Sequence, residues 1–145
     1  MKLQQLSVFL ENRRGELQQT TQVLADAGIN IATLSLADTE QFGILRLIVR
    51  DWEQAKAALE RADWVVNLTE VVAVEVTDQP GGLAEVLKVV EDADINIEYM
   101  YAFTFRRNDR AVLVFRFEDP DAAIKVIQDA GLSVLGHVEL YEDQD

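Results

Sequence analysis

An internal repeat constrains the fold of this chain more than any other feature. At an offset of 66 residues, eight positions are identical in the two halves. They are Gly15, Leu17, Val23, Asp26, Ala27, Ile29, Asn30 and Ile31, which match Gly81, Leu83, Val89, Asp92, Ala93, Ile95, Asn96 and Ile97. Further on the offset becomes 68, so that Asp51, Ala55 and Ala62 match Asp119, Ala123 and Ala130, and the insertion falls around "FRRNDRA". The sequence therefore predicts two similar units, at 1–70 and 71–145. We expect them to pack together, because "NLTEVVAVEV" contains no Gly, Pro or Ser that would mark a linker.

Each half contains the same order of predicted elements. Apolar, β-branched segments predict four strands per half, at "LSVFL", "INIATLSLAD", "FGILRLIVR" and "WVVNL", and at "VVAVEV", "INIEYMYAFTF", "RAVLVFRFE" and "LSVLG". Helical spacing predicts two helices per half, with inward faces at Leu17, Thr21 and Leu24, Ala55, Leu59 and Ala62, Leu83, Leu87 and Val90, and Ala123, Ile127 and Ala130. Asp51 and Asp119 are suited to N-cap the second helix of each half, and Pro120 to occupy a first helical position.

The resulting order, βαββαβ twice, predicts an α+β fold of two ferredoxin-like units. Right-handed crossovers place both helices of a unit on one face of a four-stranded antiparallel sheet. The tail "VELYE" at 138–142 falls opposite "EVVAV" at an offset of 68, which predicts an additional short strand.

Composition excludes several classes of protein. The chain has 13 Lys and Arg against 26 Asp and Glu, a net charge of −13, which argues against a nucleic acid or an anionic membrane as partner. It has no cysteine and one histidine, so no thiol nucleophile, disulfide, thiolate metal site or histidine cluster can form. No apolar run is long enough to span a bilayer, and "MKLQQLSVFLENRR" becomes polar too early for a signal peptide. We therefore expect a cytoplasmic protein without metal or cofactor.

The predicted strand from Ile95 to Arg106 is apolar on both faces. Tyr99, Tyr101, Phe103 and Phe105 alternate along it, so they share the face away from Met100 and Ala102. Such a strand is normally covered on both sides. The aromatic side chains either fill a core between two sheets or contribute hydroxyl groups to a ligand pocket there. On a wide sheet, this aromatic stripe predicts an exposed patch that a symmetric homodimer would cover.

The repeated glycine turn is the candidate functional feature. In "ENRRGELQQT" and "TDQPGGLAEV" a strand ends, Gly15 or Gly81 permits an unusual backbone conformation, and a helix begins. The first helical turn has unpaired N–H groups and partial positive charge, which can hold a carboxylate or a phosphate. Asn12 and Asp78 precede the turns and can accept a hydrogen bond from an ammonium group. The turns therefore suit a free amino acid, although Asn12 and Asp78 could instead simply cap them.

The segment "TDQPGGLAEVLKVVEDADINI" resembles the signature of the ACT domain, with Asp-x-Pro-Gly-x-Leu before a helix and Asn-Ile at the second strand. The resemblance covers the whole chain, once per half, and "SVFLENRRGEL", "LADTEQFGILRLIV", "INIEYMYAF" and "LVFRFEDPDAAI" resemble stand-alone tandem ACT proteins of bacteria. It implies a non-catalytic regulatory protein that binds an amino acid at an ACT–ACT interface, against these turns and the strands of the neighbouring domain.

This resemblance implies a set of ligand-binding residues at the turns and at the Asn-Ile pairs. They are Asn12, Arg13, Gly15, Glu16, Leu17, Asn30 and Ile31 in the first half, and Asp78, Gln79, Gly81, Gly82, Leu83, Asn96 and Ile97 in the second. For the wall of the pocket on the opposing unit, our candidates are Asp38, Phe42, Tyr99 and Tyr101. Arg14 stands where the pattern has Pro, Asn12 where Asp is commoner, and Asp94 where Gly is usual, so the two sites need not be equivalent.

Two other functions remain open. An enzyme of the acylphosphatase type would pair an Arg with an Asn around a phosphate, and Arg13, Arg14 and Asn12 could supply these groups. The acidic chain and the second turn, built on Asp78, argue against that chemistry. The chain could also be an interaction subunit that regulates a metabolic enzyme without a ligand of its own.

Overall fold

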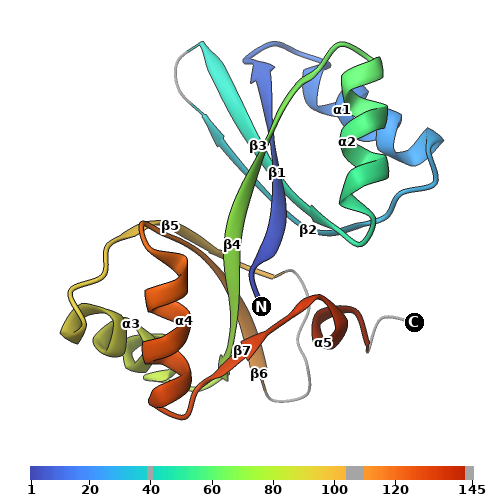
Figure 1. Ribbon diagram of the computed structural model, residues 1–145. Coiled ribbons are helices and arrows are strands. Elements are labelled where there is room, and N and C mark those ends of the chain that lie inside the picture. The colour runs from blue at the N-terminus through green and yellow to red at the C-terminus, as the bar shows by residue number, and fades with distance from the viewer. Residues whose placement is uncertain (39–40, 104–109, 143–145) are drawn as a thin grey trace. The chain divides into compact units, whose positions relative to one another are not determined.

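The computed structural model describes residues 1–38, 41–103 and 110–142, and only the backbone of Asp38, Val138 and Glu142. Figure 1 shows the elements in chain order. They are β1 (Leu3–Glu11), α1 (Glu16–Asp26), β2 (Ile31–Asp38), β3 (Phe42–Val49), α2 (Trp52–Arg61), β4 (Val65–Thr77), α3 (Gly82–Asp92), β5 (Ile97–Ala102), β6 (Arg110–Phe117), α4 (Pro120–Asp129), β7 (Ser133–Leu135) and α5 (His137–Glu142). None of the helices in these ranges has the length and hydrophobicity needed to span a bilayer.

The chain divides into two compact units. We call Gln4–Thr69 the first unit, and Glu70–Asp145 together with Met1–Leu3 the second unit. The N-terminal residues are tied to the second unit by Lys2, whose Nζ lies 3.1 Å from Asp121 Oδ1 and 3.3 Å from Glu70 Oε2. Hydrogen bonds to Asp121 and then Glu70 raise the pKa of Lys2 above its ordinary value.

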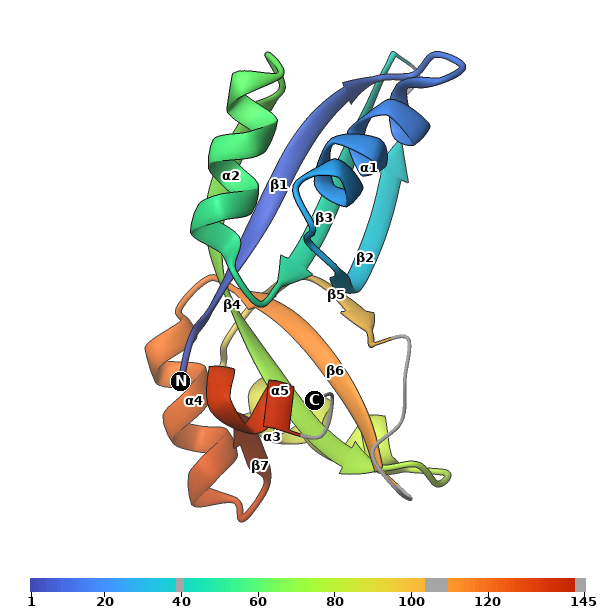
Figure 2. The same ribbon diagram turned by 90° about the vertical axis from the view of Figure 1, so that its right-hand side faces the viewer.

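The first unit has the strand order β2-β3-β1-β4, with antiparallel pairing of β3 to both β1 and β2. Alternation along the strands directs one set of side chains toward the helices, as where Leu6 pairs with Leu47 and Leu36 with Leu45. Helices α1 and α2 lie side by side on that face (Figures 1 and 2). The buried core between these helices and the sheet consists of Leu6, Val8, Leu10, Leu24, Leu45, Leu47, Val49, Ala55, Leu59 and Val66.

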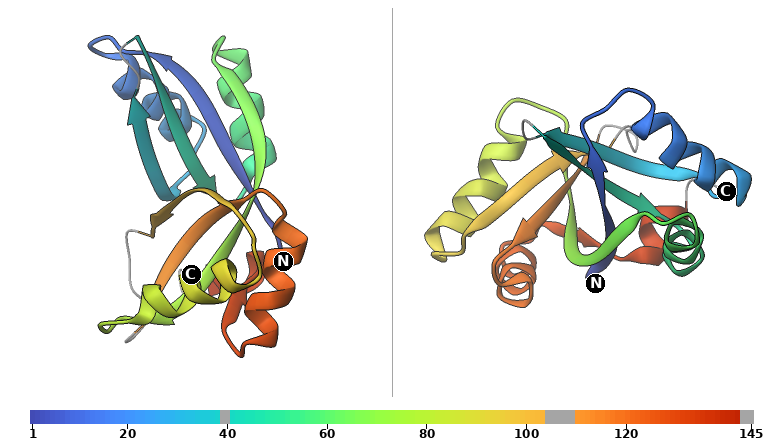
Figure 3. Two further views of the ribbon diagram at one scale, coloured as in Figure 1. Left: turned by 90° about the vertical axis from the view of Figure 1, so that its left-hand side faces the viewer. Right: turned by 90° about the horizontal axis from the view of Figure 1, so that it is seen from above.

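The second unit repeats this arrangement with the order β5-β6-β4-β7, again antiparallel at each of its three pairings. Helices α3 and α4 lie side by side on one face of its sheet (Figure 3). Its core contains two stacked aromatic rings, Phe115 and Phe117, whose centroids lie 5.2 Å apart. The other buried members are Val72, Val74, Val76, Val86, Val90, Leu113, Ala123, Ile127 and Val134. The α+β prediction of two ferredoxin-like units is therefore confirmed.

The predicted caps of the second helices are present. Asp51 Oδ1 accepts a hydrogen bond of 3.1 Å from the backbone N–H of Gln54, and Asp119 Oδ1 accepts one of 3.2 Å from that of Ala122. Pro120 occupies the first position of α4, where its missing N–H costs no helical hydrogen bond. Gly28 and Asp94 follow the first helices of the two units with positive φ values of 74° and 59°.

Replacing Asp119 with alanine should destabilise the second unit by about 0.5–2 kcal/mol, because the N-terminal amides of α4 lose their side-chain acceptor. Urea unfolding followed by circular dichroism measures the change. Asp119→Asn is the matched control, because asparagine keeps an acceptor oxygen and should retain most of the stability. Equal losses in the two variants would contradict a role for the cap.

Three sequence-based expectations are wrong. The segments "WVVNL" and "VVAVEV" are not separate strands, because they form the single strand β4. The tail at 138–142 belongs to helix α5 and not to a strand. Gly136 N–H donates to Glu139 Oε2 at 3.1 Å, which satisfies a backbone donor at the start of α5. Leu140 and Tyr141 are then buried, so the tail is held by side-chain packing instead of a strand ladder.

The third error concerns the inward faces of the helices. Leu17 and Leu83 are 39% and 40% exposed, and the buried residues of these helices are instead Thr20 and Leu24 in α1 and Gly82, Val86 and Val90 in α3. Both leucines lie in the first turn of their helix, directly after the loop that follows the preceding strand. This end of the helix lies at the margin of the core. Ala62 and Ala130 are likewise exposed, because they are C-cap residues beyond the last turn of α2 and α4.

The aromatic stripe is not an exposed patch in the part of β5 that the structure describes. Tyr99 and Tyr101 are half-buried and Phe103 is 8% exposed, while Phe105 and the segment up to Arg106 lie outside the described residues. Met100 packs on the helix-side core, but Ala102 is exposed. The large exposed apolar side chains with more than a third of their surface accessible are Met1, Phe9, Leu17, Leu34, Leu36, Phe42, Val65, Leu68 and Leu83.

Candidate functional site

The two glycine turns have the same backbone geometry. Gly15 has φ 92° and ψ −15°, and Gly81 has φ 93° and ψ −10°, in the left-handed region that only glycine adopts without strain. A Cβ atom at Gly81 would meet nothing within 4 Å, and one at Gly15 would meet only Gln19 Nε2 at 3.9 Å. Glycine is therefore required here by the backbone conformation and not by close packing, and the space beside each turn is open.

Helices α1 and α3 begin without a side-chain cap. The N-cap residues Gly15 and Gly81 have no side chain to accept from the helix amides, whereas Asp51 and Asp119 cap α2 and α4. The carbonyl oxygens of Gly15 and Gly81 accept hydrogen bonds from the backbone N–H groups of Gln19 and Glu85, which are the first hydrogen bonds of α1 and α3. Uncapped amides and the positive end of the helix dipole at an exposed turn suit a small anion.

The first turn is partly occupied by its own side chains. The backbone N–H of Asn12 donates to the carbonyl of Gln41 at 3.0 Å, which fixes the turn against the start of β3. Glu16 Oε1 accepts from the backbone N–H of Glu11 at 3.2 Å, and Arg13 Nε lies 2.8 Å from Glu11 Oε2. The Glu16 side chain is only 13% exposed, so a carboxylate already sits at the beginning of α1.

The second turn has no such carboxylate, because Gly82 stands at the position of Glu16. Gly82 is buried, and a Cβ on it would overlap the carbonyl oxygen of Thr77, so α3 starts in direct contact with the end of β4. Its N–H donates to the carbonyl of Gln79 at 3.1 Å. Asp78 and Gln79 are exposed beside this start. The second turn is therefore the more open of the two.

The structure brings some of the predicted residues to the first turn. Phe42 pairs with Glu11 in the sheet and is 54% exposed, so it lies next to Asn12. Asp38 pairs with Gly43 in the same hairpin, with only its backbone described. Leu17 adds a second exposed apolar side chain at the helix start. In the second unit, the hairpin that would lie beside the turn includes 104–109, which are outside the described residues.

The Asn-Ile pairs lie away from the turns within each unit. Asn30 and Ile31 follow the C-terminal end of α1, and Asn96 and Ile97 follow that of α3. Each helix has 11 residues, which separates its two ends by about 16 Å at 1.5 Å per residue. One small ligand cannot contact both the glycine turn and the Asn-Ile pair of the same unit.

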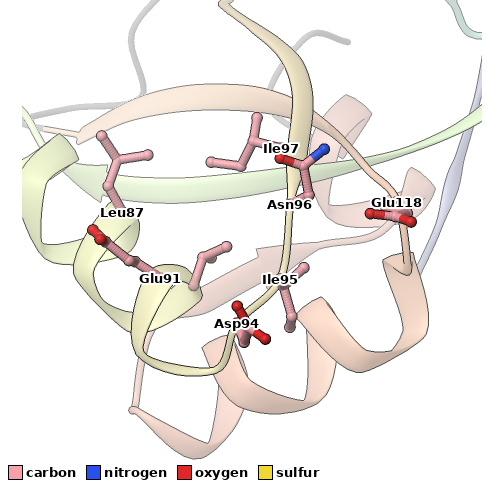
Figure 4. Close-up of a pocket in the computed structure, with 8 residues that line it drawn as sticks. Leu87, Glu91, Asp94, Ile95, Asn96, Ile97 and Glu118 are labelled. Atoms are coloured by element: carbon pink, nitrogen blue, oxygen red, sulfur yellow. The ribbon is translucent and has the colours of Figure 1, made fainter.

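A groove of about 650 Å³ lies at this second end of α3. Figure 4 shows Leu87 and Glu91 from α3, the segment Asp94–Ile97, and Glu118 around it. The groove has an apolar floor and is bordered by the exposed carboxyl groups of Glu91, Asp94 and Glu118. Their negative charges disfavour the binding of an anion in this groove. The sequence analysis did not predict this groove. The pattern that could have indicated it is the pair Leu87 and Val90 on one face of the helix, followed by Ile95 and Ile97.

Within the described ranges, no group of three or more His, Cys, Asp or Glu side chains could hold a metal ion.

Comparison with known proteins assigns the chain to a family. No curated protein matches it. Among solved structures, the protein BT0572 from Bacteroides thetaiotaomicron is 39% identical and superposes with a TM-score of 0.91 over 98% of this chain and 97% of that one. The regulatory subunits of aspartate kinase from Thermus thermophilus, in the ligand-free form, and Thermus flavus share the fold at 18% and 19% identity, with TM-scores of 0.63 and 0.61. They align over 88% of this chain and over 91% and 92% of theirs. The family model for an ACT domain pair matches residues 1–142, and the chain therefore belongs to the family of ACT domain pairs.

Proposed function

We propose that this protein is a non-catalytic regulatory module that binds a free amino acid at a glycine turn. The observation that carries the proposal is the difference between the helices of each unit. Asp51 and Asp119 close the N-termini of α2 and α4, whereas α1 and α3 start at left-handed glycines without a side-chain cap. A bound carboxylate would replace the missing caps by accepting from the first-turn amides.

The second turn is the preferred site in this proposal. An incoming carboxylate at α1 meets the charge of Glu16, which already accepts from Glu11 N–H, whereas Gly82 presents no side chain at α3. Asp78, exposed beside Gly81, supplies an acceptor for the ammonium group of the same ligand. Together the first-turn amides of α3 and the Asp78 carboxylate complement the two opposite charges of a zwitterion. Leu83, 40% exposed, offers apolar contact for its side chain.

The comparisons support the regulatory part of this proposal. The aspartate kinase proteins that share the fold are regulatory subunits, and they align over nearly their whole length, so a pair of ACT domains serves there as a separate regulatory chain. We propose the same kind of role here, as a homodimer that responds to an amino acid and acts on a metabolic enzyme.

A thermal-shift screen of the protein amino acids tests the proposal, with calorimetry for each one that raises the melting temperature. A ligand present at about 100 times its dissociation constant should add about 2.7 kcal/mol of stability. Asp78→Ala should weaken binding by about tenfold or more, since the loss of a hydrogen bond to a charged group is worth about 1.5–3 kcal/mol. Gly81→Val should abolish binding, because valine cannot adopt the left-handed conformation that aims the α3 amides at the ligand.

Asn12→Ala and Gly15→Val are the matched controls in the first turn and should leave the affinity unchanged. Circular dichroism confirms that each variant is folded. If the first-turn variants lose binding and the second-turn variants keep it, the ligand occupies the first turn. If all four variants bind normally, neither turn is the site. If no amino acid raises the melting temperature, an interaction subunit without a ligand of its own replaces this proposal.

A further inference from the structure

The carboxyl groups around the groove at the C-terminal end of α3 belong to the second unit alone. Glu91, Asp94 and Glu118 lie on different sides of this groove (Figure 4). At the repeat offsets of 66 and 68 residues, the residues of the first unit at these three positions are Ala25, Gly28 and Arg50. Because the two units have the same fold, the fold itself does not require the three carboxyl groups.

These carboxyl groups also lack a cationic partner within the part of the chain that the structure describes. No ion pair or hydrogen bond there involves the side chain of Glu91, Asp94 or Glu118. Lys88, which precedes Glu91 by one helical turn, pairs instead with Asp92, with 2.9 Å between Nζ and Oδ2. Carboxylates that surround one groove without a cation repel one another, and a cation bound between them is stabilised by all three.

Backbone hydrogen bonds fix the walls and the floor of the groove. The N–H of Ile95 donates to the carbonyl of Val90 at 3.2 Å, and the N–H of Glu118 donates to the carbonyl of Asn96 at 3.1 Å. The apolar lining consists of Leu87, Val90, Ile95 and Ile97. A site whose backbone is already in place loses less conformational entropy when a ligand binds.

We propose that this groove, which we call the acidic groove, docks a segment of a partner protein that carries lysine or arginine beside apolar side chains. The apolar side chains of the segment lie on the floor, and Glu91, Asp94 and Glu118 accept hydrogen bonds from its cationic groups. A volume of about 650 Å³ suits a few side chains of such a segment. The inference rests on the proposed regulatory role, because it supplies the surface through which the chain acts on another protein.

Charge complementarity favours a basic segment over other occupants. The net charge of −13 attracts a basic partner from a distance and repels an anionic one. A single exposed ion pair contributes little, so a small free amine is held weakly by these exposed carboxyl groups. A segment with several cations pairs with more than one carboxyl group and also covers the apolar floor. The acidic groove lies at the other end of α3 from the glycine turn, so it does not compete with the amino-acid site of its own unit.

Fluorescence anisotropy with a labelled peptide of alternating lysine and leucine tests the docking. In an extended peptide the leucines share one face, and the long lysine side chains can reach the carboxyl groups beside the floor. The wild-type chain should bind the peptide saturably and more weakly as salt is raised. A peptide of alternating glutamate and leucine should not bind. The free diamine cadaverine should compete only at concentrations at least about tenfold higher than the unlabelled peptide. No binding of the basic peptide, equal binding of the acidic one or equal competition by cadaverine would each overturn the proposal.

Two exchanges between the repeats provide a variant and its matched control. Glu91→Ala/Asp94→Gly introduces the residues of the first unit, and glycine suits the φ of 59° at Asp94. It should weaken binding of the basic peptide by about fivefold or more. The control Glu60→Gln/Asp63→Gly removes two carboxyl groups at the end of α2, where Asp63 has a φ of 69°, and should bind as the wild type does. Circular dichroism checks that both variants are folded. An unchanged affinity in the groove variant, or equal losses in both variants, would contradict the docking site.

Methyl NMR of the wild-type chain locates the bound peptide. Signals of Leu87, Ile95 and Ile97 should shift during the titration, whereas those of Leu45 and Leu59 in the core of the first unit should not. Shifts that leave the three groove residues unaffected would place the peptide elsewhere and overturn the proposal.

The amino-acid screen on the same protein without peptide separates this proposal from the proposed function. If the basic peptide binds in the acidic groove and no amino acid raises the melting temperature, the docking surface stands and the amino-acid site fails. If an amino acid raises the melting temperature and the basic peptide does not bind, the amino-acid site stands and the docking surface is overturned.

Discussion

Replacing Phe115 with alanine should lower the stability of the second unit by about 3–5 kcal/mol. Phe115 is fully buried in β6, and its ring stacks on that of Phe117 at 5.2 Å with an interplanar angle of 8°. The substitution removes both the apolar contacts of the ring and this aromatic pair, and it leaves a cavity among the valines of β4 and the helices above them. Urea denaturation monitored by circular dichroism measures the loss.

Phe9→Ala is the matched control for this substitution, because Phe9 is 40% exposed and its removal should change stability by less than about 1 kcal/mol. Hydrogen exchange then locates the effect. Amides of β6 and α4 should exchange much faster in Phe115→Ala, while those of β1 and β3 should change less, because each unit has its own core. Equal acceleration in all four elements would show that the two cores unfold together.

Replacing Gly82 with valine should destabilise the second unit by about 1–3 kcal/mol and also abolish ligand binding. A Cβ at this position would overlap the carbonyl oxygen of Thr77, so the start of α3 must move away from the end of β4. That movement displaces the uncapped amides that we propose as the carboxylate site. Thermal unfolding with and without amino acid measures both effects.

Glu85→Ala is the control for Gly82→Val, since Glu85 is exposed in the same first turn of α3 and should alter stability by less than about 0.5 kcal/mol. A Gly82→Val protein that is as stable as the wild type would contradict the close contact between α3 and β4. If it is destabilised but still binds an amino acid with unchanged affinity, the ligand does not depend on the start of α3.

The internal repeat and hydrophobic periodicity were sufficient to predict most of the fold. The residues that are identical in the two halves predicted two βαββαβ units. Asp51, Asp119 and Pro120 correctly predicted where α2 and α4 begin. These features are local, because a cap or a strand pattern depends on residues within a few positions of each other. Gly15 and Gly81 were recognised for the same reason, since a left-handed turn before a helix is a local requirement.

Tertiary structure decided which of the apolar residues are buried. Leu17, Leu34 and Leu36 fit the apolar pattern of their elements, but their place at a helix start or on an edge strand leaves them exposed. The sequence indicated that the two turns need not be equivalent, and the tertiary structure shows how they differ, since Glu16 accepts a hydrogen bond from the Glu11 amide and Gly82 packs on Thr77. Sequence periodicity reports which face of an element is apolar. Exposure depends on which neighbours reach that face, and the fold alone determines this.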